Sequence, residues 1–249
     1  MRAKLINPKH YYNEFKQLSQ FVINPVYNAN HTLTLSQKIE GTWTMFVVKM
    51  ILAIIVGVSI GIFYDADNKT TISMAERFSP LALFFVSVIA LPLLEEIESR
   101  LSLKFKPIFL ALTLSAIGYV IASKTMYDAK LSDIHNHFLE RITIVIALLL
   151  VTYPLFSIPR VKKALELFWE KKFRWIFYFF CFGFAWMHIF NYELTLEHLL
   201  LMPIITLDKL VSAMCYGYTR MNYGFIYSLA IHMVNNSIGF IVKMLSGAD

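Results

Sequence analysis

Charge is what this sequence of 249 residues has least of. Only 16% of its residues are charged and 57% are hydrophobic, whereas a soluble domain is roughly 25% charged and about 45–50% apolar. The apolar residues also gather in runs of about 15–22, a length that crosses about 30 Å of hydrocarbon. These proportions exclude an ordinary soluble enzyme and indicate a membrane protein.

Cysteine is nearly absent as well. Cys181 and Cys215 both lie inside apolar runs, so they offer neither a disulfide framework nor a CxxC site, and we interpret them as small core residues. The first forty-two residues lack the uninterrupted apolar core of a signal peptide. We therefore expect residues 1–42 to form a polar N-terminal arm that is either adjacent to the membrane or loosely ordered.

The apolar runs predict the fold class, an all-α, polytopic transmembrane bundle with a polar intramembrane cavity. About seven spans are expected, within a range of six to eight. They should lie at residues 43–63, 81–103, 107–122, 142–156, 173–190, 199–218 and 223–245. Residues 43–249 would then form one transmembrane domain.

Basic residues are concentrated in alternate connections between these runs: the N-terminal arm, Lys104 and Lys106, residues 160–174, and Arg220. By the positive-inside rule, this alternation predicts that the N terminus is cytoplasmic. We expect the protein to reside in the cell membrane. The lipid bilayer then explains the net charge of +6 without a nucleic-acid partner. Residues 160–174 also carry apolar residues at helical spacing, which predicts either a basic amphipathic helix on the inner surface or a solvated linker.

A dense polar cluster follows the uncharged stretch Leu81–Leu94, because Glu95, Glu96, Glu98 and Arg100 come directly after it. Inside a membrane each such group is costly, so a function for them is the first expectation. Glu96 and Arg100 stand four residues apart and can pair on one helix face. Glu95 then has no partner on its own helix, which suits a general base.

Two later spans carry histidines among apolar residues. His188 follows Phe184 by four residues, and a lone histidine of this kind can simply bond a neighbouring carbonyl. His232 and Asn236 also stand four residues apart, so they share a helix face. Two strong hydrogen-bonding side chains on one face indicate a polar site.

The sixth predicted span contains Asp208 and Lys209. Adjacent residues do not face each other on a helix, so we expect no ion pair between them. The sequence suggests no function for either residue.

Three motifs occur in order: Glu95-Glu96-x-x-x-Arg100, Phe184-x-x-x-His188 and His232-x-x-x-Asn236. Together they resemble the motifs of the CAAX prenyl protease and bacteriocin-processing family, also called the Abi family, of intramembrane glutamate proteases. The resemblance covers about residues 80–245, and residues 217–236 also look like that family's C-terminal motif region. Ser99 and Leu101 depart from the pattern, since the family often has an aromatic residue and a glycine at these positions.

The resemblance implies an endopeptidase that hydrolyses a peptide bond without a metal or cofactor. Glu95 would activate a water molecule that His188 positions. The other motif residues would stabilise the oxyanion (His232, Asn236) or support the site (Glu96, Arg100). The implied substrate is a peptide or protein tail, either lipidated or bacteriocin-like.

Two other functions stay open at this point. Two histidines and a glutamate would also suit a zinc-dependent membrane protease, although the sequence contains no HExxH motif. A non-proteolytic scaffold or a bacteriocin-immunity protein would keep the fold without the cleavage.

Overall fold

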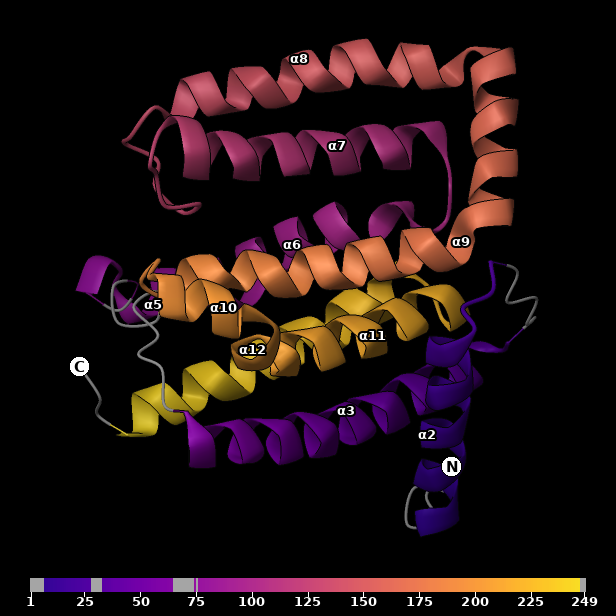
Figure 1. The fold of residues 1–249 in the computed structure, drawn as a ribbon, viewed down its shortest axis with the longest axis vertical. Helices are drawn as coiled ribbons and strands as arrows, with labels where there is room; N and C mark the ends of the chain where they lie inside the picture. The colour runs from indigo at the N-terminus through magenta and orange to yellow at the C-terminus, as the bar shows by residue number, and fades with distance from the viewer. Residues whose placement is uncertain (1–6, 28–32, 65–73, 75, 247–249) are drawn as a thin grey trace.

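The computed structural model describes residues 7–27, 33–64, 74 and 76–246, and every regular element in these ranges is a helix. The long helices run side by side across Figure 1, in layers that pass from α8 and α7 through α6 and α9 to α11, α12 and α3. In the described part of the chain, six helices are long and apolar enough to cross a membrane, and a bent pair of helices brings the number to seven if it is counted as one span. The predicted all-α transmembrane bundle is confirmed.

The spans follow the expected order. The first is α3 (Leu35–Phe63). The second is one helix that changes type along its length and comprises α5 (Pro80–Phe84), the π-helical turn η1 (Phe85–Ala90), α6 (Leu91–Ser99) and the 3-10 turn η2 (Leu101–Leu103). A hairpin of α7 (Pro107–Ile121), prolonged by η3 (Ala122–Met126), and α8 (Phe138–Ser157) comes next. The remaining elements are α9 (Pro159–Met187), η4 (His188–Asn191), α10 (Leu196–Ile205), α11 (Leu207–Asn222) and α12 (Phe225–Ser246).

The first span begins at Leu35, earlier than the predicted residue 43. Thr34 explains this start, because its hydroxyl accepts from the Gln37 amide at 3.3 Å while the Gln37 side chain accepts from the Thr34 amide at 2.8 Å. Such a reciprocal cap satisfies two amides that a helix start leaves unpaired. Residues 35–42, which their polarity assigned to the arm, therefore belong to the first helix.

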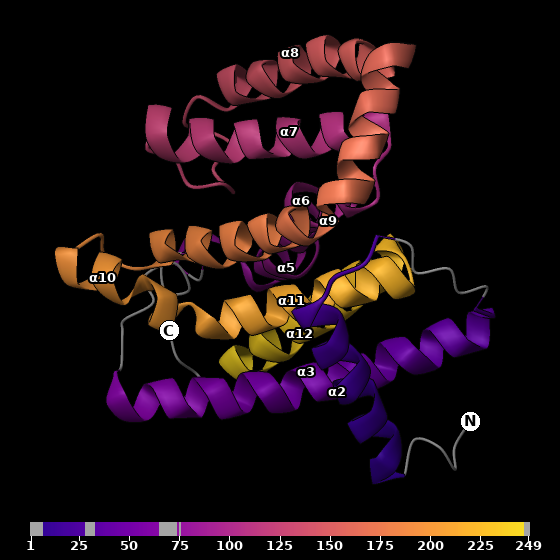
Figure 2. The same ribbon diagram turned by 45° about the vertical axis from the view of Figure 1, so that its right-hand side comes forward.

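The arm itself contains a helix, α2 (Pro8–Ile23), which crosses the bundle at one end (Figures 1 and 2). Leu18 and Phe21 are buried in the main apolar cluster. The Tyr223 hydroxyl donates to the Glu14 carboxylate at 2.6 Å, and burial raises the pKa of Glu14. A loosely ordered arm is therefore wrong for residues 8–23, while residues 1–6 and 28–32 lie outside the described ranges.

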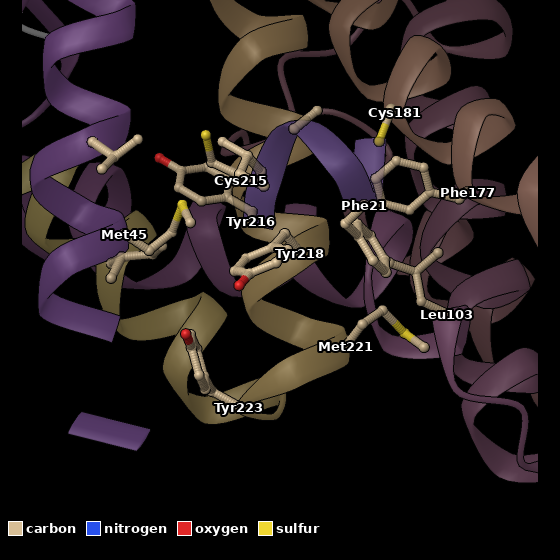
Figure 3. Packing of buried hydrophobic residues seen from close by; sticks show 14 of the residues in the cluster. Phe21, Met45, Leu103, Phe177, Cys181, Cys215, Tyr216, Tyr218, Met221 and Tyr223 are labelled. Atoms are coloured by element: carbon tan, nitrogen blue, oxygen red, sulfur yellow. The ribbon is translucent and has the colours of Figure 1, made fainter. Parts of the chain in front are cut away.

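The main apolar cluster lies where α2, α3, α9 and α11 meet (Figure 3). Phe21 from α2 packs edge-on against Phe177 from α9, with ring centroids 5.2 Å apart. Cys181 and Cys215 are both buried here as free thiols, which confirms their prediction as small core residues. The cluster joins the N-terminal helix to the helices that carry the polar residues described below.

The sixth span is bent by 41° between α10 and α11, where Thr206 separates the two helices. Asp208 and Lys209 lie in the first turn of α11, and their side chains form an ion pair of 2.7 Å. The prediction that these neighbours would not pair is wrong. A lysine side chain is long and flexible enough to curl back along a helix start.

The basic connections gather at one end of the bundle. At the right of Figure 1, α2 and the first part of α9 run across the other helices, and the α6–α7 and α11–α12 connections lie at the same end. Residues 160–174 are thus helical and continuous with the fifth span, rather than a linker. Arg220 differs from the prediction, because it is buried in α11 and donates to the carbonyls of Arg100 and Leu101 at 3.1 and 2.9 Å.

The orientation of this basic end is testable by labelling. Lys172 is exposed on α9, whereas Cys181 and Cys215 are buried, so a Lys172→Cys variant carries one accessible thiol in the described ranges. By the positive-inside rule, a membrane-impermeant maleimide added to intact cells should not react with it. The same reagent should label it after permeabilisation, and prompt labelling of intact cells would reverse the orientation.

Candidate functional site

The second span supplies the carboxylates, and its backbone is irregular just before them. In the π-helical turn η1, hydrogen bonds reach back five residues, as shown by the Leu91 amide that donates to the Val86 carbonyl. Pro92 follows in the first turn of α6 and has no amide hydrogen to continue the ladder. Glu95, Glu96 and Glu98 therefore stand on a short α-helical stretch that starts at a break in the hydrogen-bond register of the span.

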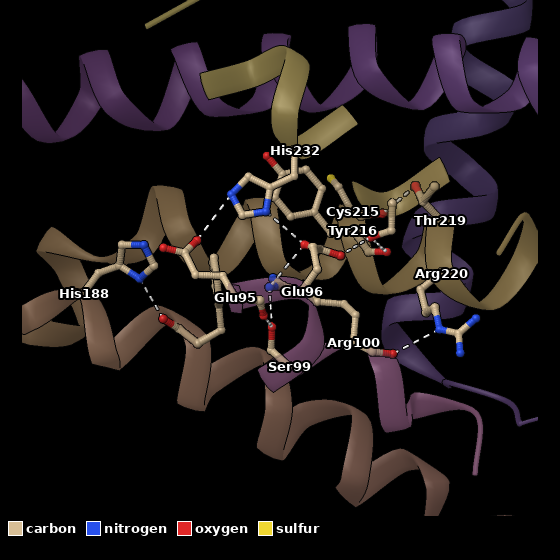
Figure 4. A network of polar contacts seen from close by, with 12 residues as sticks. Glu95, Glu96, Ser99, Arg100, His188, Cys215, Tyr216, Thr219, Arg220 and His232 are labelled. Atoms are coloured by element: carbon tan, nitrogen blue, oxygen red, sulfur yellow. Dashed lines mark hydrogen bonds and ion pairs between the residues drawn. The ribbon is translucent and has the colours of Figure 1, made fainter. Parts of the chain in front are cut away.

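Glu96 lies at the centre of a buried polar network (Figure 4). Its carboxylate is 3.5 Å from Nη1 of Arg100, which confirms the predicted pair. The Ser228 hydroxyl donates to its second oxygen at 2.6 Å, and Nδ1 of His232 lies 3.0 Å from the first. Three partners from α6 and α12 thus compensate for the removal of this carboxylate from water.

His232 links the two neighbouring glutamates. Its Nδ1 faces Glu96, while its Nε2 lies 3.4 Å from Oε2 of Glu95. The ring also stacks on Tyr216 at a centroid distance of 4.7 Å and an interplanar angle of 23°. Glu95 is therefore contacted across the bundle by a residue that helix spacing alone does not pair with it.

Glu95 and His188 line a cavity of about 540 Å³ between α6, α7, α9 and the segment that follows η3. Figure 4 shows the His188 ring beside the Glu95 carboxylate. Nδ1 of His188 lies 2.8 Å from the Phe184 carbonyl. A carbonyl only accepts, so Nδ1 carries a hydrogen and Nε2 of the neutral ring is left as an acceptor. A quarter of the Glu95 side chain is exposed, and Glu98 lines the same cavity.

Asn236 lies apart from this cavity. Its side-chain nitrogen donates to the Ser87 carbonyl in η1 at 2.9 Å. His232 and Asn236 therefore share one face of α12, as predicted, because both contact the η1–α6 segment. They do so at different levels, with His232 at the carboxylates and Asn236 at the break that precedes them.

Several side chains of the site were not singled out in the sequence. Ser228 stands four residues before His232, so the spacing used for the motifs would have found it. Tyr216 is one aromatic residue among many and gives no such signal. Lys49, a single charge inside the first apolar run, does give one; it is buried, and its ammonium group donates to the Asn235 side chain.

The Arg100 guanidinium is buried against an aromatic ring as well as a carboxylate. Its central carbon lies 3.8 Å from the centroid of Phe184, the first residue of the second motif. Such contact with a ring face is favourable for a desolvated cation. The first and second motifs therefore touch each other through Arg100 and Phe184, as well as facing the same cavity.

Among the described residues, no group of three His, Cys, Asp or Glu side chains is arranged to hold a metal ion. Comparison of the chain with protein-family models, curated proteins and solved structures gave no match. The function is therefore inferred from the arrangement of the side chains. This arrangement offers the partly exposed carboxylate of Glu95, the His188 imidazole with Nε2 as an acceptor in the same cavity, and the His232 imidazole in contact with Glu95.

The two adjacent glutamates should differ in what they contribute to stability. Glu96→Gln strands Arg100 and weakens the contact with His232, and loss of one partner in a buried ion pair costs about 3–5 kcal/mol. Glu95→Gln changes a partly exposed side chain with one such contact. We expect Glu96→Gln to lower the melting temperature in detergent clearly more than Glu95→Gln, and the reverse order would exchange their roles.

Proposed function

We propose that this protein is an intramembrane endopeptidase that hydrolyses a peptide bond with a water molecule activated by Glu95. The observation that supports it best is that Glu95 and His188 line the same cavity, which lies between α6, α7, α9 and the segment that follows η3. A carboxylate and an imidazole that share a cavity can hold one water molecule and remove its proton. The motif resemblance points to the same two residues.

The chemistry divides among three side chains. Glu95 takes a proton from a water molecule that Nε2 of His188 holds, and the resulting hydroxide attacks the scissile carbonyl. We assign a hydrogen to each ring nitrogen of His232, so that Nδ1 donates to Glu96. Once Glu95 is protonated, its contact with Nε2 weakens, and Nε2 donates to the oxyanion instead. The proton on Glu95 then passes to the leaving amine as the C–N bond breaks.

The other motif residues support the side chains that carry out the reaction. Glu96 and Arg100 fix His232 and the end of α6 through the contacts described above. The resemblance gives Asn236 an oxyanion role too, but one of its two amide hydrogens is donated to the Ser87 carbonyl, at the turn that precedes the carboxylates. We therefore assign oxyanion stabilisation to His232.

The cavity volume suits a short segment of extended peptide, since ligand pockets commonly span about 300–1,000 Å³. We propose a peptide or protein tail as the substrate, entering from the membrane interface of a cell membrane with the N terminus in the cytoplasm. Lipidated and bacteriocin-like tails both fit this description.

Loss of the general base should stop cleavage without unfolding the protein. We expect Glu95→Gln to reduce kcat by about 10²–10⁴, the range for a positioned general base. The substrate is found by comparing the peptides of membranes that contain wild-type or Glu95→Gln protein, and is then tested with purified protein. Glu166→Gln, a change on the exposed face of α9, serves as the matched control and should retain activity.

If Glu95→Gln membranes contain the same peptides as wild type, a non-proteolytic scaffold or immunity protein is the better function. A scaffold should tolerate this near-isosteric change, because the variant keeps the shape of the bundle. Wild-type and variant proteins of equal melting temperature make that comparison fair.

Chelation separates water activation by Glu95 from zinc catalysis. If Glu95 is the base and His232 an oxyanion donor, cleavage should survive prolonged chelation, and the purified protein should carry well under one zinc per chain. In a zinc protease the ion activates the water, so chelation should abolish turnover. Stoichiometric metal together with chelator-sensitive cleavage would overturn the proposed mechanism.

A further inference from the structure

The break in the second span leaves one carbonyl without its helical donor. In η1 the Leu91 amide donates to Val86, five residues back. If this spacing continued, the amide of residue 92 would donate to the Ser87 carbonyl. Residue 92 is a proline, which has no amide hydrogen, so this hydrogen bond cannot form. Ser87 is half-buried, and a carbonyl without a donor is costly in a membrane, where water cannot replace the missing amide.

Asn236 occupies the place of the missing amide. Its Nδ2 atom lies 2.9 Å from the Ser87 carbonyl oxygen, and its Oδ1 accepts from Asn235 Nδ2 at 3.2 Å. Asn235 in turn accepts from the ammonium group of Lys49. The chain of hydrogen bonds thus runs from α3 through α12 to the π-helical turn.

Lys49 fixes the donor-to-acceptor direction of these hydrogen bonds. An ammonium group can only donate, so the atom of Asn235 that faces Lys49 must be its oxygen. Asn235 then presents its nitrogen to Asn236, whose oxygen accepts and whose nitrogen is directed at Ser87. A buried lysine in the middle of an apolar helix therefore determines which way two amides point.

We propose that Lys49, Asn235 and Asn236 form a polarised relay that supplies the Ser87 carbonyl with the donor that Pro92 lacks. The relay holds the π-to-α junction from which Glu95 and Glu96 project, so Asn236 is a positioning residue of the site. This inference does not rest on the proposed peptidase activity, because it follows from the hydrogen bonds and from the chemistry of proline.

A double-mutant cycle with Pro92→Ala tests the relay. The alanine amide can donate to Ser87 itself, so the Asn236 hydrogen bond becomes redundant in that background. We expect Asn236→Ala to lower the melting temperature of the wild type in detergent by about 2–8 °C, the effect of losing the partner of a half-buried carbonyl. In the Pro92→Ala background the same change should cost less than half as much.

Ser237→Ala is the matched control on α12. The Ser237 hydroxyl donates to the Met233 carbonyl on its own helix at 2.8 Å and takes no part in the relay. Its effect on the melting temperature should be equal in both backgrounds. An Asn236→Ala effect that is equally independent of Pro92 would overturn the proposal and would favour a separate role for Asn236.

A direct observation of the carbonyl remains available if Pro92→Ala fails to fold. Ser87–Val88 is the only Ser–Val bond in the sequence, so serine labelled with ¹³C at the carbonyl and valine labelled with ¹⁵N single out this carbonyl by NMR. Both Asn236→Ala and Lys49→Met should shift its ¹³C signal upfield as the hydrogen bond is lost or reoriented, while Ser237→Ala should leave it in place. An unchanged Ser87 signal in Asn236→Ala would rule out the relay, whether or not the protein cleaves peptides.

Discussion

The rest of the site depends on a carboxylate that has no contact with water. Glu96 is fully buried, and its oxygens are satisfied by an arginine on its own helix and by a serine and a histidine on α12. The free-energy cost of removing such a charge from water is offset only when its partners are held in place. The requirement ties α6 to α12 and fixes the imidazole of His232 against Glu95.

The sequence predicted those parts of the site that depend on helix periodicity. Residues four apart share a face, and this rule identified the Glu96–Arg100 pair and the common face of His232 and Asn236. It could not show which residue on another helix each would meet. The contact of His232 with Glu95 and the hydrogen bond of Asn236 with Ser87 both depend on how α12 packs against the break in the second span.

Depth was harder to predict than spacing. With 1.5 Å of rise per residue, the fourteen residues from Arg174 to His188 span about 21 Å and the nine from Glu95 to Lys104 span about 13–14 Å. The sequence alone therefore suggests that His188 lies about 7 Å deeper than Glu95. In the structure both residues line one cavity. The count assumed that the helix enters the membrane at Arg174, whereas α9 begins at Pro159, crosses the end of the bundle and then turns along it. Similarly, polarity alone could not show that residues 8–23 would fold back as α2 and pack into the core.

The dependence of α6 on α12 has a consequence for biogenesis. A chain is made from its N-terminal side, so the carboxylates of the second span enter the bilayer long before Ser228, His232 and Asn236 exist. Until the last span arrives, Glu96 has only Arg100 from its own helix, and the carbonyl opposite Pro92 has no donor. The polar groups of the second span are therefore incompletely satisfied until α12 is inserted, and insertion of α12 is the step that completes the site.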